Sequence, residues 1–116
     1  MTSKELRVAA SRRASALRTA VTRATLLEVA YNIAKTHSNG LAAVERKAVC
    51  EQAKVGAGTV NYHFQTMKYL RDEVLKLAIR DKNVRLVAQG VLEGNPLALT
   101  APRALRRQIS KIIPTT

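Results

Sequence analysis

The stretch AVCEQAKVGAGTVNYHF, residues 48–64, decides the fold of this chain. Its first half has the apolar spacing of a short helix that stops before residue 54, and its second half places Val60 and Phe64 four residues apart. Side chains at that spacing share one face of a helix. Residues 54–56 between the two halves are suited to a tight turn, with Val55 filling the gap between the helices. We therefore predict a helix-turn-helix.

The second of these helices has an outer face that is free for contact with a partner. Its glycines, placed at the helix start, let backbone amides approach a phosphate closely. Asn61 is suited to pair with adenine, or it is simply a solvated helix position. Tyr62 is expected to touch a nucleic-acid backbone or base, and His63 a phosphate unless it is half-buried. The predicted contact residues of this helix are Ala57, Gly58, Thr59, Asn61, Tyr62 and His63.

The charge of the chain points to a polyanionic partner. Among 116 residues, 20 are Lys or Arg and 8 are Asp or Glu, so the net charge is +12. Residues 1–23 carry six basic groups and one acid, a net charge of +5, and residues 101–116 carry four basic groups and no acid. Both ends are expected to act as basic arms. Residues 3–23 are expected to form a first helix, capped by Ser3 or Ser11, that is loosely ordered until it meets its partner. Arg12, Arg13, Arg23, Lys54 and Lys68 complete the predicted DNA contacts.

Other functional classes find little support in the composition. Cys50 is the sole cysteine and is read as a small buried residue, with redox sensing as the alternative. No apolar run approaches the roughly 20 residues of a membrane span, and no signal peptide precedes the basic N-terminus, so we expect a cytoplasmic protein. The scarcity of aromatic residues favours duplex over single-stranded partners. No carboxylate pair or nucleophile–base set appears, so we expect no enzyme. His63 has no second candidate ligand nearby, so we expect no metal, and we expect no cofactor and no small-molecule ligand either.

The remaining sequence is helical in period, so the fold class is all-α with a three-helix core. Residues 24–40 contain one amphipathic helix that ends in Ser38, Asn39 and Gly40, and residues 41–53 form a short surface helix. The pattern after Phe64 predicts one extended fourth helix, and a short C-terminal helix follows with Thr100 as its cap. The predicted division is a basic N-terminal arm or helix, residues 1–21, a helix-turn-helix DNA-binding domain, residues 22–80, and a helical dimerisation segment with a basic tail, residues 81–116.

The fourth helix carries apolar residues at close to heptad spacing, namely Leu70, Val74, Leu77, Val84 and Val91. A monomer that exposed all of them would have an unusually large apolar patch. We therefore expect a homodimer held by residues 74–113, with Asp81 at the edge of the interface. The basic segment RALRRQISKII, residues 103–113, packs on this dimer or lies on an anionic membrane.

The segment VCEQAKVGAGTVNYHFQTMKYL, residues 49–70, resembles the DNA-binding signature of the tetracycline-repressor family. The matching residues are Val49, Cys50, Ala53, Val55, Gly58, Thr59, Tyr62, His63, Phe64 and Leu70, with Leu26, Leu27, Ala30 and Gly40 upstream. Lys54 replaces the glycine of that family, Gly56 its serine cap, Asn61 its tyrosine and Met67 its phosphate-binding lysine, for which Lys68 stands in. The family normally continues into a large ligand-binding domain, and the 36 residues after position 80 are too few to build one.

The resemblance implies a sequence-specific transcriptional regulator, by family analogy a repressor, which binds a palindromic operator in double-stranded DNA as a homodimer. The alternative is a basic protein that coats DNA or RNA without sequence preference.

Overall fold

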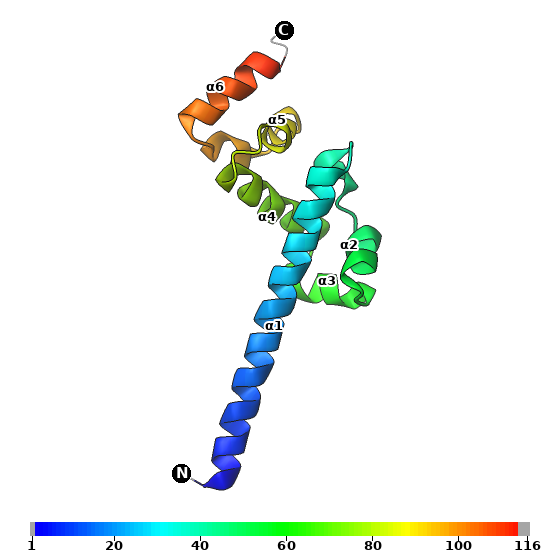
Figure 1. Ribbon diagram of the computed structural model, residues 1–116, viewed down its shortest axis with the longest axis vertical. Coiled ribbons are helices and arrows are strands. Elements are labelled where there is room, and N and C mark those ends of the chain that lie inside the picture. The colour runs from blue at the N-terminus through cyan, green and yellow to red at the C-terminus, as the bar shows by residue number, and fades with distance from the viewer. Residues whose placement is uncertain (1, 114–116) are drawn as a thin grey trace.

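The computed structural model describes residues 2–113, and within that range every regular element is a helix (Figure 1). The elements are α1 (Ser3–Thr36), η1 (Gly40–Ala43), α2 (Arg46–Ala53), α3 (Ala57–Phe64), α4 (Met67–Arg80), α5 (Val84–Leu92), η2 (Pro96–Thr100) and α6 (Arg103–Ile112). The predicted all-α class is confirmed. The chain measures 69 × 29 × 19 Å along its principal axes, and it is this long because half of α1 projects beyond the other helices (Figure 1).

Helix α1 begins earlier than the sequence suggested and runs unbroken through residue 21. Thr2, and neither of the serines at 3 and 11, caps it: the Thr2 hydroxyl accepts from the Glu5 N–H at 3.2 Å, and the Glu5 carboxylate accepts from the Thr2 N–H at 3.1 Å. This reciprocal pair satisfies two backbone donors of the first turn. The predicted first helix is therefore present over residues 3–21, where alanine and arginine are strong helix formers and the start is well capped.

The second half of α1 packs against the rest of the chain. Leu26, Ala30, Ile33 and Ala34 are buried, which is the spacing that the sequence predicted, and Leu27 is half-buried. The same core continues through α2, α3, α4, α5 and α6 without a break. Helix α4 packs against α1 and η1, and helix α5 packs against η1. Both helices therefore help to complete the core to which the second half of α1 contributes.

Helices α2 and α3 are joined by residues 54–56 and lie beside the middle and end of α1 (Figure 1). The predicted helix over residues 41–53 is divided at Val44, which is buried between η1 and α2. Helix α2 stops before Lys54, as expected, and Val55 packs half-buried against the core. Val60 and Phe64 are fully buried, so the inner face of α3 is the predicted one.

The predicted extended fourth helix is wrong, because α4 and α5 are separate helices. Lys82 has a φ of +56°, and the Asn83 side chain accepts from the Leu86 N–H at 3.2 Å and so caps α5. Asp81 ends α4 and accepts a hydrogen bond from the Tyr31 hydroxyl at 2.9 Å, so it belongs to the turn between α4 and α5.

The turn between α4 and α5 also removes the argument that a monomer exposes the whole heptad pattern. Leu70 and Val74 are fully buried within the chain, and Leu77, Val84 and Val91 are half-buried against the same core. The chain therefore covers most of this apolar surface by folding α5 back, without a second copy.

Helix α6 starts after Pro102, which occupies the cap position itself. The Thr100 hydroxyl donates to the Leu97 carbonyl at 2.6 Å inside η2, so the expected Thr100 cap is wrong. Leu105 and Ile109 are buried in the core, which leaves α6 little apolar surface with which to lie on a membrane. None of the helices in residues 2–113 combines the length and apolarity needed to cross a bilayer.

Two polar side chains of α5 hold the chain segment that follows α1. The Arg85 guanidinium donates to the carbonyls of Ala34 and Lys35 at 2.8 and 2.9 Å, where the end of a helix leaves carbonyls without intrahelical partners. Gln89 accepts from the Leu41 N–H at 2.7 Å and donates to the Asn39 carbonyl at 2.9 Å. These bonds fix the C-terminal segment to the end of α1 by specific geometry as well as by apolar contact.

Candidate nucleic-acid interface

Helix α3 has one face inside the core and one face in solvent. Val60 and Phe64 are 1% and 0% exposed, whereas Tyr62 is 74% exposed. Asn61 is exposed beside it, and His63 is half-buried, with its ring in edge-on contact with Tyr62 at 5.0 Å between ring centres. The exposed side thus offers an amide and a phenol on a helix whose other side is held rigidly.

The start of α3 has no large side chain, so a partner could approach its backbone closely. Gly56 caps the helix without a side-chain hydrogen bond, and Gly58 lies in the first turn. A Cβ atom added at either glycine would meet nothing within 4 Å, and neither glycine has a positive φ. Ala57 is exposed between them and Thr59 is half-buried. The fold does not require glycine at these positions, since alanine would fit both and would favour the helix at Gly58.

Lys54, at the turn before α3, holds an unfavourable backbone conformation. Its φ and ψ of 58° and 47° are left-handed, a conformation that glycine usually supplies after a helix. A lysine there is disfavoured by about 1–2 kcal/mol through contact of its Cβ with the backbone. The side chain is exposed, so it adds a positive charge next to the start of α3.

Arg23 is the α1 residue that the structure brings to α3. Its guanidinium carbon lies 4.7 Å from the centre of the Phe64 ring, a cation–π arrangement that fixes the side chain against the end of α3. Arg12 is exposed 11 residues earlier, about three helical turns and roughly 16 Å along the axis, and so faces nearly the same side of α1. Arg13 is exposed too, but it is rotated by about 100° from Arg12.

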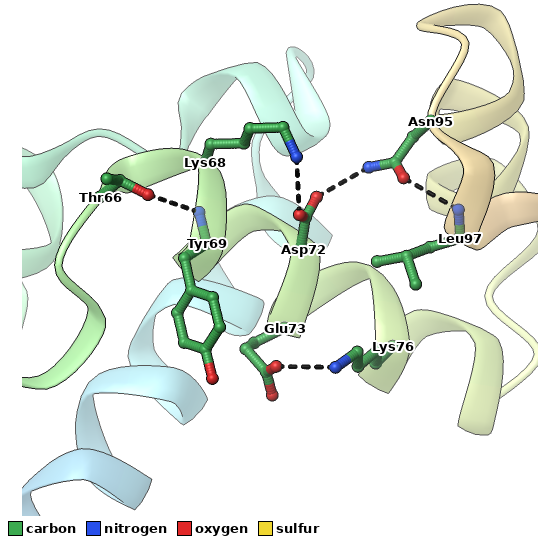
Figure 2. A network of polar contacts seen from close by, with 8 residues as sticks. All are labelled: Thr66, Lys68, Tyr69, Asp72, Glu73, Lys76, Asn95 and Leu97. Carbon is green, nitrogen blue, oxygen red and sulfur yellow. Dashed lines mark hydrogen bonds and ion pairs between the residues drawn. The ribbon is translucent and has the colours of Figure 1, made fainter.

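Lys68 lies in the first turn of α4, just beyond α3, and is part of a polar network (Figure 2). Its ammonium is 3.0 Å from the Asp72 carboxylate, whose other oxygen accepts from the Asn95 amide at 2.8 Å. Burial opposes ionisation of Asp72, but the hydrogen bonds from Lys68 and Asn95 and the ammonium charge outweigh it, so the pKa of Asp72 is lowered. The Lys68 side chain is 82% exposed and can also reach an outside anion.

The sequence prediction missed Tyr69, which is 45% exposed beside Lys68. Its backbone N–H donates to the capping Thr66 hydroxyl at 3.1 Å (Figure 2). Its ring centre lies 6.2 Å from that of Phe64. The available signal was its place next to Lys68 in the first turn of α4.

Cys50, in α2, packs behind the turn that leads into α3. It is buried, and its Sγ lies 3.6 Å from the Gly56 carbonyl, close enough for the thiol to donate a weak hydrogen bond across the turn. This placement favours the interpretation as a small buried residue.

The predicted contact residues thus fall into two groups. Lys54 and Lys68 lie just before and just after α3 along the chain, and Arg23 packs on Phe64 at the end of α3, whereas Arg12 and Arg13 lie out along the projecting half of α1. Across residues 2–113 there is no cluster of three or more potential metal ligands. Comparison with protein-family models, with curated proteins and with solved structures finds no match.

Proposed function

We propose that the protein binds double-stranded DNA in a sequence-specific manner and regulates transcription, with α2 and α3 acting as a helix-turn-helix and α3 entering the major groove. The observation that carries the proposal is the two-sided character of α3. Val60 and Phe64 anchor it, while its outer side has an open glycine-containing start followed by exposed Asn61 and Tyr62. A helix that enters a groove needs this combination of a rigid inner face and an unobstructed outer one.

The charge distribution supports a phosphate partner around that helix. Arg23 and Lys68 flank α3, and Lys54 precedes it at the expense of backbone strain. A net charge of +12 favours any polyanion, so charge by itself would also suit a protein that coats nucleic acid without preference. The outer face of α3 favours the sequence-specific function, because a charge-based coat does not need an exposed amide on a rigid helix.

The resemblance of residues 49–70 to the tetracycline-repressor signature supports the same function, and by that analogy the protein acts as a repressor on a palindromic operator. Two copies would place two α3 helices about one duplex turn apart. The apolar residues that remain exposed on the C-terminal segment are Leu92, Leu99 and Ile112, which are 69%, 66% and 62% exposed. Leu99 also lines a groove of about 290 Å³ between α5, η2 and α6, and we propose the surface around this groove for the homodimer contact.

The first experiment is selection of bound duplexes from random DNA, followed by affinity measurements over a range of salt concentrations. We expect one enriched sequence, and a log–log salt slope of about 0.9 for each phosphate contacted. Steep salt dependence without any enriched sequence would contradict specific binding and favour the coating function.

Two substitutions separate the reading of bases from the attraction of phosphates. Asn61→Ala should relax preference at one base pair, by about 1–3 kcal/mol, because its bidentate contact is lost. Lys68→Ala should weaken all duplexes alike, since a phosphate contact carries no sequence information. If Asn61→Ala also lowered every affinity equally, base recognition by that residue would be excluded.

Gly58→Ala tests the open start of α3. The added methyl group has no neighbour within 4 Å, so we expect it to stabilise the folded chain by about 0.5–1 kcal/mol. In the complex it would occupy the space of the approaching duplex and weaken binding about tenfold, or roughly 1.4 kcal/mol. Thermal unfolding and duplex titration of the same sample measure the two effects, and unchanged duplex affinity would remove Gly58 from the interface.

A further inference from the structure

The projecting half of α1 carries an apolar face that no other part of the described chain covers. Every residue from 10 to 21 is exposed, and the two large apolar side chains among them, Leu17 and Val21, are 65% and 56% exposed. They belong to a run with alternating spacing of four and three residues, which consists of Ala10, Ala14, Leu17, Val21 and Ala24. This spacing is that of the contact positions in a helix pair. The five residues are termed the α1 apolar face.

The α1 apolar face points away from α3. Arg23 marks the side of α1 that faces α3, because its guanidinium lies over the Phe64 ring. At about 100° per residue, Leu17 lies about 120° and Val21 about 160° around the helix from Arg23. The surface around α3 and the α1 apolar face are therefore on different sides of the same helix, and a duplex bound at α3 would leave Leu17 and Val21 in water.

Arginines flank the α1 apolar face on both sides. With Leu17 at position d and Val21 at position a of a heptad, Arg13 takes position g and Arg18 position e. No acidic residue occurs between Glu5 and Glu28, so neither arginine has an acid three or four residues away on α1 to pair with. None of the ion pairs formed within residues 2–113 involves them either.

This charge pattern disfavours a second copy as the occupant. In a parallel pair, position g of one helix faces position e of the other. Arg13 of each copy would therefore face Arg18 of the other copy, once on each side of the pair. In an antiparallel pair the e positions face one another, and Arg18 would meet Arg18 near the centre. Like charges at these positions oppose pairing, whereas glutamate or aspartate at the same positions would favour it.

We propose that the α1 apolar face is a docking surface for an amphipathic helix of a different protein, with an apolar stripe flanked by acidic residues. Such a helix covers Leu17 and Val21 and places its carboxylates against Arg13 and Arg18. Phosphates of a nucleic acid would satisfy the arginines alone and leave the apolar side chains exposed, so the apolar face favours a protein partner. The inference goes beyond DNA binding and does not depend on it.

The probe for the test is a synthetic helix of about three heptads, with leucine at a and d and glutamate at e and g. A shuffled peptide of identical composition, without an apolar stripe, is the charge-matched control. Fluorescence anisotropy with the full chain should show that the ordered peptide binds at least about tenfold more tightly than the shuffled one. Equal binding of the two peptides would overturn the proposal, since the attraction would then be charge alone.

Substitutions assign the effect to the α1 apolar face. The double variant Leu17→Gln, Val21→Gln keeps good helix formers at both positions and should abolish the preference for the ordered peptide, while duplex affinity changes by no more than about twofold. Circular dichroism checks that α1 remains helical, and Leu17→Ala, Val21→Ala provides a second test with the strongest helix former. Arg12→Gln is the matched control, which should leave the peptide preference intact.

Charge reversal at Arg13 and Arg18 tests the role of the arginines beside the α1 apolar face. Arg13→Glu, Arg18→Glu should exchange the preference, so that a peptide with lysine at e and g binds more tightly than the one with glutamate. Two results would overturn the proposal. In the first, the unsubstituted chain self-associates in sedimentation and the variant Leu17→Gln, Val21→Gln does not. In the second, that variant loses much of its duplex binding while its peptide binding is unchanged. The first would assign the surface to a second copy and the second to DNA. Absence of sequence-specific duplex binding, with the peptide results as expected, would refute only the proposed function.

Discussion

Gly40→Ala should destabilise the fold more than any other glycine-to-alanine change in the chain, because two separate effects coincide there. Gly40 has a φ of +59°, and an added Cβ atom would overlap the Gln89 side-chain oxygen. The left-handed conformation disfavours alanine by about 1–2 kcal/mol. Moving the Gln89 amide away breaks its hydrogen bonds to the Leu41 N–H and the Asn39 carbonyl, at about 0.5–1.5 kcal/mol each. We therefore expect a total loss of about 2–5 kcal/mol.

Gly94→Ala is the matched control. Gly94 has a similar φ of +73° but nothing lies within 4 Å of its added Cβ, so only the conformational loss of about 1–2 kcal/mol remains. Urea unfolding followed by circular dichroism measures both variants, and a third measurement repeats Gly40→Ala in a Gln89→Ala background. In that background the loss should fall to the value of Gly94→Ala, a coupling of about 1–3 kcal/mol. Equal losses for Gly40→Ala and Gly94→Ala, or no coupling to Gln89, would refute the reasoning that Gln89 fixes the segment after α1.

Lys54→Gly should act in opposite directions on stability and on DNA binding. It relieves the left-handed strain and so stabilises the fold by about 0.5–1 kcal/mol in urea unfolding, and it removes a cation beside α3, which should lower the salt slope by about 0.9. Tyr31→Phe concerns alkaline stability: burial, followed by the hydrogen bond to Asp81, raises the pKa of Tyr31 from 10.0 to about 12. The folded chain then holds the phenol proton more tightly than the unfolded chain, so this stabilisation is complete below pH 10 and is lost towards pH 12. Between pH 10 and pH 12 the free energy of unfolding should fall less steeply with pH for Tyr31→Phe than for the unsubstituted chain. Equal slopes for the two proteins would exclude the contribution of Tyr31.

Local sequence was enough to predict the parts of the fold that depend on neighbouring residues. The helix spacing of Ala30 and Ile33, the end of α2 before Lys54 and the burial of Val60 and Phe64 all follow from periodicity over one or two turns. The two-sided character of α3 could be predicted for the same reason. The functional roles of its outer residues remain predictions, because a duplex is needed to test them.

Some predictions failed where contacts distant in sequence decide the outcome. The heptad spacing across residues 70–91 continues through Asp81, and local pattern alone cannot tell one long helix from two. The chain turns there because Asp81 bonds to Tyr31, 50 residues away in sequence, while Arg85 and Gln89 bond to carbonyls at the end of α1. Leu70 and Val74 are buried in the same core within one copy of the chain.

The sequence by itself therefore determined the helical class, the basic character of both ends and the inner and outer faces of α3, since charge and short-range periodicity are properties of the chain alone. Only the tertiary structure decided which apolar residues remain exposed. Leu105 and Ile109 are buried in the core, whereas Leu17 and Val21 are exposed to solvent. The latter two are exposed because the other helices pack against the second half of α1 and leave the first half projecting (Figure 1). Exposure depends on which segments meet in space, and this is set by the summed contacts of the whole chain rather than by any one stretch of it.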